Sequence, residues 1–271
     1  MEHNQIEIKT SDHLHLNDDR IKLYWQIESK DLNLGSIKQL VLPSLQIELI
    51  FIMQGSLYVN GSRVDDPFVA PVLVKWKEVE FTPGTVIFGI RLNPVHFHLF
   101  SGLELNDLEQ APNFLKHVLC DRTYHHLTRI VFEEEDFENR VVKLNKFFFD
   151  SFRSQDEGDE LILNCLNVIA NQTVLEVNKL ASNNGYSERW IQKLFKRKVG
   201  INPSKVIQIS RFNRFLSLLA DNSINKLSEA CYEVGYSDQS HLIHDFNKFT
   251  DQTPKLYLRE VPSFVKLMNC K

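Results

Sequence analysis

Gly185–Gly200 reads GYSERWIQKLFKRKVG, and Gly235–Pro254 reads GYSDQSHLIHDFNKFTDQTP. Both stretches open on a Gly-Tyr-Ser turn and continue into a run with apolar residues at helical spacing. Downstream of the turn the two stretches align at a separation of 51 residues, which pairs Phe195 with Phe246. A helix, a short turn containing glycine and a second helix make a helix-turn-helix, so the sequence predicts this unit twice.

The ends of these runs have residue types that start and stop helices. Ser187 and Asp238 carry side-chain oxygens that accept hydrogen bonds from the first backbone amides of a helix. Gly200 is placed to end the first helix in the left-handed conformation. A long helix expected at Pro203–Asp221 has a broad apolar stripe that packs against both units. It fixes the separation of the recognition helices, which must be about 34 Å, one turn of DNA, to enter successive major grooves.

The formal net charge of −4 hides an asymmetry between the two halves of the chain. Residues 1–159 contain 16 Lys and Arg against 25 Asp and Glu, a net charge of −9, whereas residues 160–271 contain 15 against 10, a net charge of +5. A basic domain is typical of proteins that bind a polyanion such as DNA, although a merely solvated basic surface has the same composition. The two halves are expected to meet different partners.

Composition limits the class of protein. Hydrophobic residues at 43% and charged residues at 24% are typical of a soluble globular protein. The four cysteines are scattered without a CxxC pair, which favours a reducing cytoplasm over a zinc ribbon or a disulfide framework. The polar N-terminus lacks an apolar signal region, and no window approaches the length of a membrane span. A cytoplasmic location without membrane contact is therefore expected.

The periodicity of hydrophobic residues changes along the chain. Residues 40–100 alternate short β-branched and aromatic runs with turn signals, which predicts antiparallel strands and hairpins. From about Asp107 the spacing becomes helical, and SQDEGDE at 154–160 has the composition of a linker. The expected fold class is α+β with two domains: a mainly antiparallel β domain, barrel-like or sandwich-like, with trailing helices at 1–153, and an all-α domain at 161–271.

The segment ACYEVGYSDQSHLIHDFNKFTDQTPKLYLRE, with the unit before it, resembles the C-terminal DNA-binding domain of the AraC/XylS family of bacterial transcription regulators over about residues 160–260. The resemblance implies two helix-turn-helix units joined by one long helix, with double-stranded DNA and RNA polymerase as partners. Asp251 stands where the family commonly has Gly, a change that Asp tolerates in the left-handed conformation. His244 and Asn247 stand where Arg and Lys are common, which indicates a weaker second DNA contact.

By this resemblance the recognition helices lie at about 187–199 and 238–249. The residues expected to contact DNA are outward-facing side chains of these helices: Arg189, Gln192, Lys193, Lys196, Arg197, Lys198, Gln239, Ser240, Ile243 and His244. Arg and Lys donate to guanine O6 and N7 and Gln pairs with adenine, so the first three are expected at base edges. The basic run 196–198 is expected on phosphates. Ordinary solvated surface is the alternative interpretation of every one of these positions.

In the N-terminal half, about residues 35–110 are similar to sensor-like domains that precede some AraC-type modules. In the wider family this domain is often a β-barrel that binds a small-molecule effector and is followed by helices that dimerise. A sheet domain rich in Phe can enclose an apolar ligand, but the same side chains can equally form the core alone. The candidates for the wall of such a pocket are Phe51, Met53, Trp76, Phe88 and Phe97.

Other chemistry has little support in the sequence. His96 and His98 would share one face of a strand, as in the metal motif of cupin barrels, but Glu104 is one residue too far and Asn93-Pro94 indicates a turn. No nucleophile elbow, phosphate loop or HExxH motif occurs, so we predict no enzyme activity, no metal site and no cofactor. The alternative function is a small-molecule-binding or metal-binding barrel protein with a helical protein-interaction tail.

A homodimer is suggested by FENRVVKLNKFFFDSF at 137–152. Successive helical residues turn by about 100°, so three consecutive phenylalanines cannot all face one side. We expect Val141, Leu144 and Phe148 to pack on the N-terminal domain, which leaves Phe147 or Phe152 toward a second surface. Burial of that surface in a homodimer, or on both sides within one chain, would account for its apolar character.

Overall fold

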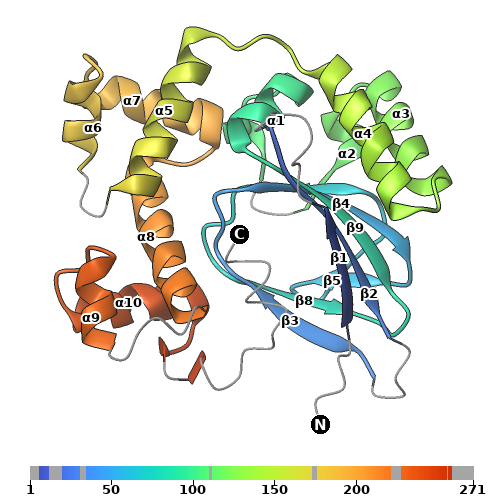
Figure 1. The fold of residues 1–271 in the computed structure, drawn as a ribbon, viewed down its shortest axis with the longest axis horizontal. Helices are drawn as coiled ribbons and strands as arrows, with labels where there is room; N and C mark the ends of the chain where they lie inside the picture. The colour runs from blue at the N-terminus through green and yellow to red at the C-terminus, as the bar shows by residue number, and fades with distance from the viewer. Residues whose placement is uncertain are drawn as a thin grey trace. The chain divides into compact units, whose positions relative to one another are not determined.

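The computed structural model describes residues 6–11, 20–30, 35–109, 112–172, 176–220, 227–254 and 256–257 (Figure 1). The chain divides into two compact units. The first contains residues 1–39, 46–71 and 78–155, and the second contains 40–45, 72–77 and 156–271. The expected fold class is confirmed, since antiparallel sheets make the first unit and helices dominate the second.

A six-stranded sheet is the centre of the first unit. Its order is β1-β2-β9-β4-β7-β10, and each neighbouring pair is antiparallel. The strands are β1 (Ile6–Ser11), β2 (Ile21–Ser29), β9 (Val86–Leu92), β4 (Ile47–Gln54), β7 (Phe68–Ala70) and β10 (Asn113–Phe114). A second sheet has the order β3-β8-β5-β6, with β3 (Ile37–Val41), β8 (Lys77–Phe81), β5 (Leu57–Val59) and β6 (Ser62–Val64). Antiparallel strands thus occupy much of residues 40–92 as expected, but Pro94–Ser101 forms helix α1, because Asn93 caps a helix there and Pro94 begins it.

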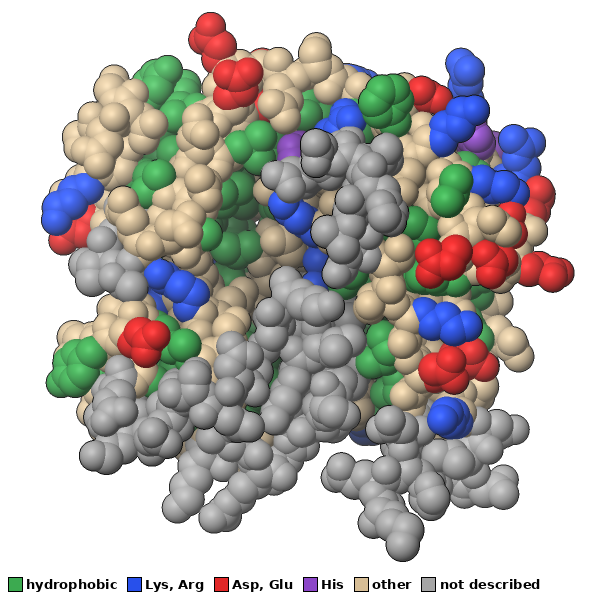
Figure 2. Space-filling model, in the orientation of Figure 1, with side chains coloured by type: hydrophobic (Ala, Val, Ile, Leu, Met, Phe, Trp, Pro, Cys, Tyr) green, Lys and Arg blue, Asp and Glu red, His purple; other side chains and the backbone are tan. Residues whose placement is uncertain are grey.

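Helices follow β9 in the first unit. They are α1 (Pro94–Ser101), the 3₁₀ turn η1 (Leu105–Asp107), α2 (Leu115–Val118), α3 (Asp121–Glu133) and α4 (Phe137–Ser151). The helices α3 and α4 cover one face of the six-stranded sheet (Figure 1). There the ring of Phe51 lies 6.2 Å from that of Phe132 in α3, and the ring of Phe88 lies 6.0 Å from that of Phe137 in α4. Figure 2 shows charged side chains of both signs over α3 and α4, so the outer side of this pair faces solvent.

Arg140 ties α4 to the sheet. Its side chain is only 1% exposed, and its Nη1 donates to Gln26 Oε1 at 2.9 Å. The guanidinium lies 5.1 Å from the ring centroid of Phe88, while Nη2 donates to the carbonyl oxygens of Glu134 and Glu135. A buried cation is stable only when it is hydrogen-bonded, and these contacts supply the partners.

The other face of the six-stranded sheet carries a second buried charge. Arg91 is 5% exposed, and its Nε donates to Glu48 Oε1 at 2.6 Å. Trp25 Nε1 donates to Glu48 Oε2 at 3.0 Å, so both carboxylate oxygens have a donor. Residues directly opposite on neighbouring strands share a face, which places this group on the side of the sheet away from Phe51 and Phe88.

The exposed apolar residues of α4 differ from those that the sequence predicted. The prediction that Phe147 faces a second surface is wrong, because its ring is 6% exposed and packs edge-on against Phe100 and His126. Phe152 is half-buried and stacks on Phe148. The large apolar side chains of α4 that remain exposed are Val142 at 66% and Phe149 at 68%. Helix α4 packs against its neighbours with a broad face that includes Leu144, Phe147 and Phe148, so only the apolar residues outside this face stay exposed.

The second unit is helical. Its helices are α5 (Glu157–Asn171), α6 (Val177–Asn183), α7 (Glu188–Val199), α8 (Pro203–Ala220), α9 (Leu227–Glu233) and α10 (Gln239–Thr250). Within this unit α8 contacts α5, α7 and α9, and α10 packs along it from Lys205 to Phe215 (Figure 1). Phe212 of α8 packs 5.5 Å from Phe246 and 4.9 Å from Phe249 of α10. The long helix expected to hold both units is therefore present and has the expected apolar contacts.

The start of α5 lies inside the segment expected to be a linker. Asp156 and Asp159 form a capping box, in which each side chain accepts the backbone amide of the other, at 2.8 and 2.9 Å. The acidic composition of residues 154–160 thus serves the first turn of a helix, where carboxylates are favoured by the macrodipole.

Candidate nucleic-acid interface

Helix α7 is held firmly at both ends and along one face. Ser187 caps it by accepting the amide of Trp190 at 3.3 Å, and Gly200 ends it with φ of 86° in the left-handed region. Ile191, Leu194 and Phe195 are buried beneath it. These caps and this apolar face are the ones that the sequence predicted. The opposite face is thereby fixed in its direction toward solvent.

A row of cations occupies that opposite face. Arg189, Lys193 and Lys196 are exposed and, at about 100° per residue, fall within roughly 60° of one another around the helix. Gln192 is exposed on one flank, where its amide donates to Glu188 at 2.9 Å, and Arg197 is exposed on the other. The structure thus brings together five of the six residues predicted on this helix. Such a row can donate to base edges and phosphate oxygens at once.

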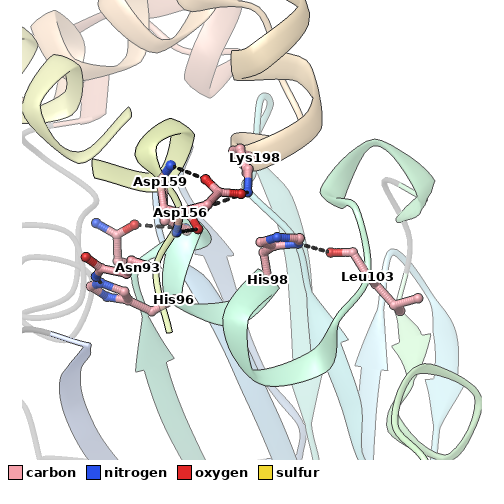
Figure 3. Close-up of polar contacts among 9 residues, drawn as sticks. Asn93, His96, His98, Leu103, Asp156, Asp159 and Lys198 are labelled. Carbon is pink, nitrogen blue, oxygen red and sulfur yellow. Dashed lines mark hydrogen bonds and ion pairs between the residues drawn. The ribbon is translucent and has the colours of Figure 1, made fainter. Parts of the chain in front are cut away.

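Lys198 requires a correction. The sequence assigned it to a phosphate, but its side chain is 3% exposed, and its Nζ lies 2.9 Å from Asp156 Oδ2 and 2.7 Å from Asp159 Oδ1 (Figure 3). Residue 198 lies seven positions after Ile191, almost two full turns, so it falls on the buried face of α7. The ammonium group therefore joins the C-terminal half of α7 to the start of α5.

An aromatic pair at the start of α7 was not among the predicted site residues. The rings of Tyr186 and Trp190 stack 4.0 Å apart with an angle of 9° between them. Both remain exposed, at 42% and 39%. Tyr186 precedes the cap residue Ser187 and Trp190 lies in the first turn of α7, so an aromatic residue just before an N-cap with another in the first turn is the sequence signal that could have identified the pair.

Helix α10 has the same design with fewer charges. Asp238 caps it by accepting the amide of His241 at 2.8 Å, while Leu242, Phe246 and Phe249 are buried. Asp251 ends the helix with φ of 59°, which confirms that Asp replaces the usual Gly in the left-handed conformation. The four residues predicted to contact DNA are placed as follows: Gln239, Ser240 and His244 exposed, and Ile243 half-buried.

A buried carboxylate lies beneath the exposed surface of α10. Asp245 is 5% exposed, and its oxygens lie 3.9 Å from His241 Nε2 and 3.7 Å from His244 Nδ1. His244 therefore has a carboxylate as well as solvent beside it, which distinguishes it from the exposed cations of α7. The exposed surface of α10 therefore carries fewer cations than that of α7.

The structure places the five predicted ligand-wall residues in several different elements. Phe51, Phe88 and Phe97 have no exposed surface, and the first two fill the contact between the sheet and α3–α4. Met53 is half-buried on β4. Trp76 belongs to the segment 72–77, which clusters with the helical unit. The five candidates thus lie on β4, β9, α1 and the segment 72–77, and their contact with a ligand stays a prediction.

His96 and His98 lie on α1, which Asn93 caps and Pro94 begins, and not on a strand. Two positions apart on a helix, they point in different directions. His98 Nδ1 contacts the carbonyl oxygen of Leu103 at 2.8 Å (Figure 3). Among the described residues, no three His, Cys, Asp or Glu side chains are grouped in a way that could hold a metal ion.

Comparison with known protein families identifies the second unit. Residues 180–260 match the family model described as a helix-turn-helix domain. The match covers both repeated units, from α6 to the end of α10, and is of the AraC type. The fold and this domain define a DNA-binding transcription regulator. No curated protein sequence matches the chain.

Several solved structures are similar to this chain at low identity. ToxT from Vibrio cholerae with a bound unsaturated fatty acid is 12% identical, with 83% of this chain and 95% of that chain covered and a TM-score of 0.42. ToxT from V. cholerae O395 bound to (E)-4-(8-methylnaphthalen-1-yl)but-3-enoic acid is 12% identical, with coverages of 97% and 98% and a TM-score of 0.46. The AraC-like transcriptional activator CuxR is 9% identical, with coverages of 71% and 80% and a TM-score of 0.30.

Among the described residues, no helix combines the length and the apolar composition needed to cross a lipid bilayer.

Proposed function

We propose that the protein is a sequence-specific transcription regulator that reads DNA with α7 and α10. The observation that carries this proposal is the exposed row of Arg189, Lys193 and Lys196 on a helix whose caps and buried face fix its orientation. The second recognition helix is attached to the same α8 through the Phe212 contacts, which supports a fixed spacing for two adjacent major grooves.

The two recognition helices have unequal roles in this proposal. Arg189, Gln192 and Lys193 read base edges, and Lys196 and Arg197 hold phosphates. On α10 the contacts come from neutral or partly buried side chains, namely Gln239, Ser240, Ile243 and His244. Since phosphate neutralisation supplies much of the affinity for DNA, α7 contributes the larger share.

Replacing Arg189 by alanine tests this ranking. We expect Arg189→Ala to weaken binding to the specific site by about 1–3 kcal/mol and to relax base preference, because the variant cannot donate two hydrogen bonds to a guanine. The measurement is a fluorescence-anisotropy titration on the specific duplex, identified from genome-wide binding sites of the tagged protein, and on a random duplex of equal length.

Arg122→Ala is the matched control, since it removes an exposed arginine from α3 in the other unit. Unchanged specific binding by Arg189→Ala together with loss of binding by His244→Ala would show that α10, not α7, dominates. Failure of the wild type to prefer any genomic site over random DNA would contradict the proposed function itself.

The first unit is proposed to control DNA binding, and the domain roles follow from this. Residues 1–153 form a sensing or dimerisation domain, 154–160 the connection, and 161–271 the DNA-binding domain. Between a small-molecule effector and dimerisation as the means of control, the exposed pair Val142 and Phe149 on α4 favours dimerisation. The two lie seven residues apart, on one face, and a second copy of the chain would bury them symmetrically.

Charge on this face should prevent dimerisation. We expect the double variant Val142→Glu, Phe149→Glu to raise the dimer dissociation constant at least about tenfold, because each buried apolar side chain contributes about 1.5–3 kcal/mol. Sedimentation velocity at tens of micromolar measures the association. Arg122→Glu, which adds the same two units of negative charge on α3, should sediment as the wild type does. A wild type that stays monomeric with and without DNA would refute the dimer.

A further inference from the structure

A pocket lies in the helical unit between the two helix-turn-helix units. Its volume is about 380 Å³. It is lined by the C-terminal end of α7, the turn after it, the start of α8, one residue of α10, and Val74 of the segment 72–77, which clusters with the helical unit. The polar side chains around it are Lys196, Asn202, Ser204, Lys205, Gln208 and Lys248. Three of these six are cations, and among the described lining residues none is acidic.

The lysines of this pocket act on one another. Burial lowers the pKa of Lys205 from its ordinary value, and the positive charge of Lys248 lowers it further. Asp245 acts in the opposite direction on Lys205, but its own oxygens lie beside His241 and His244. Two ammonium groups from different helices thus repel each other, while Lys205 Nζ donates to Gln208 Oε1 at 3.5 Å. An anion between them would remove this repulsion and gain hydrogen bonds from both.

The frame of the pocket is rigid and adds a further positive potential. Lys205 keeps its position through its ammonium group, which lies 5.3 Å from the ring centroid of Phe249. Gly200, in the left-handed conformation, turns the chain directly into α8, which begins at Pro203. Ser204 and Lys205 therefore lie in the first turn of an 18-residue helix, where the macrodipole favours negative charge.

We propose that this pocket binds a phosphate group, held by Lys196, Lys205 and Lys248. A phosphate dianion can accept hydrogen bonds from the three lysines that line the pocket, whereas an apolar ligand would desolvate these cations without pairing them. Two sources supply this chemistry: the DNA backbone between the two grooves that α7 and α10 read, or a small phosphorylated ligand. The first source rests on the proposed function, and the second does not.

The test uses the full chain and two double variants. The variant Lys205→Gln, Lys248→Gln removes two cations and keeps polar side chains of similar length. The variant Lys196→Gln, Lys248→Gln changes only exposed positions, so it should fold even if the first variant does not. Lys9→Gln, Lys146→Gln is the control, because both lysines are exposed in the other unit and the change in charge is the same. Circular dichroism and thermal melting establish that each variant is folded.

Two measurements separate the sources. In the first, salt titrations of binding to random duplex DNA should show the slope of log K against log salt falling by about 0.9 for each phosphate that the variant no longer neutralises. In the second, pyrophosphate is titrated without DNA by calorimetry, and its affinity should fall at least about tenfold in the pocket variants. A change in the first alone identifies a backbone phosphate when Lys205→Gln, Lys248→Gln shows it as well as the variant that removes Lys196, and a change in the second alone identifies a small ligand.

The proposal is overturned if both pocket variants match the control in salt slope and in pyrophosphate binding. Absence of any DNA binding by the wild type would contradict the proposed function, yet the pyrophosphate titration would still decide whether the pocket takes phosphate. The failures of the two proposals are therefore distinguishable.

Discussion

Replacement of Lys198 by alanine should lower the free energy of unfolding by about 3–5 kcal/mol, measured by urea denaturation of the full chain. The ammonium group is buried against Asp156 and Asp159, and the side chain of Asp159 is 1% exposed. Without Lys198, Asp159 keeps only its hydrogen bond from the amide of Asp156. Removing one partner of a buried ion pair leaves an uncompensated buried charge, which destabilises the fold more than replacing both partners by neutral residues does.

Lys196→Ala is the matched control for this experiment. It removes the same side chain two residues earlier on α7, at an exposed position, and should change the free energy of unfolding by less than about 0.5 kcal/mol. The double variant Lys198→Met, Asp159→Asn should recover part of the loss because both charges are gone. Equal effects of Lys196→Ala and Lys198→Ala would show that the buried ion pair does not stabilise the fold.

The contribution of Lys198 should also depend on pH. Its hydrogen bond and charge hold the pKa of Asp156 below the ordinary value, although burial of that carboxyl acts to raise it. A carboxyl whose pKa is lowered on folding adds stability above its unfolded pKa and loses it as pH falls through the folded pKa. The difference between wild type and Lys198→Ala should therefore be full at neutral pH and shrink in acid. A difference that grows on acidification would contradict the ion pair.

Gly89→Ala should be destabilising by about 3 kcal/mol or more, because the sheet has no room for a methyl group at this position. A Cβ built on Gly89 would lie 2.0 Å from Cε2 and 2.1 Å from Cζ2 of Trp25. Trp25 is 4% exposed, and its indole donates to Glu48, so the ring cannot move without breaking that bond. The two residues are direct partners on β9 and β2.

A double-mutant cycle checks the cause. Trp25→Leu makes room at the cost of packing, so the loss due to Gly89→Ala should be smaller in the Trp25→Leu background than in the wild type. Denaturation midpoints and slopes give the four free energies. Strict additivity would mean that the glycine is required for a reason other than the close approach of the indole.

The helix-turn-helix units could be predicted from the sequence because their determinants are local. Ser187 and Asp238 cap helices through amides three residues away, and Gly200 and Asp251 end them in the left-handed conformation. Hydrogen bonds of this range form in almost any tertiary setting. The exposed row of α7 follows from the same periodicity, since burial of the Ile191 face leaves the opposite face to solvent.

The misplaced residues of the predicted sites share a different physical cause. Periodicity alone already places Lys198 on the Ile191 face, but the residue type suggested an exposed cation, and the partner that makes its burial stable is 39 positions away at Asp159. Phe147 was expected at the surface because its packing partner, Phe100, belongs to a helix outside the local pattern. Both outcomes depend on which distant element packs alongside, and residue type does not report that.

Sequence by itself thus determined where helices α7 and α10 begin and end, where α8 begins, and which of their faces are apolar, since each of these depends on residues within about two turns. The expected end of α8 at Asp221 lies outside the described residues. Only the tertiary structure decided which charges are buried, which apolar side chains of α4 remain outside, and that three lysines from α7, α8 and α10 converge on one pocket. The physical reason is that desolvation and charge pairing act through space. Whether burying a charged side chain stabilises or destabilises the fold therefore depends on neighbours that are far away in the chain.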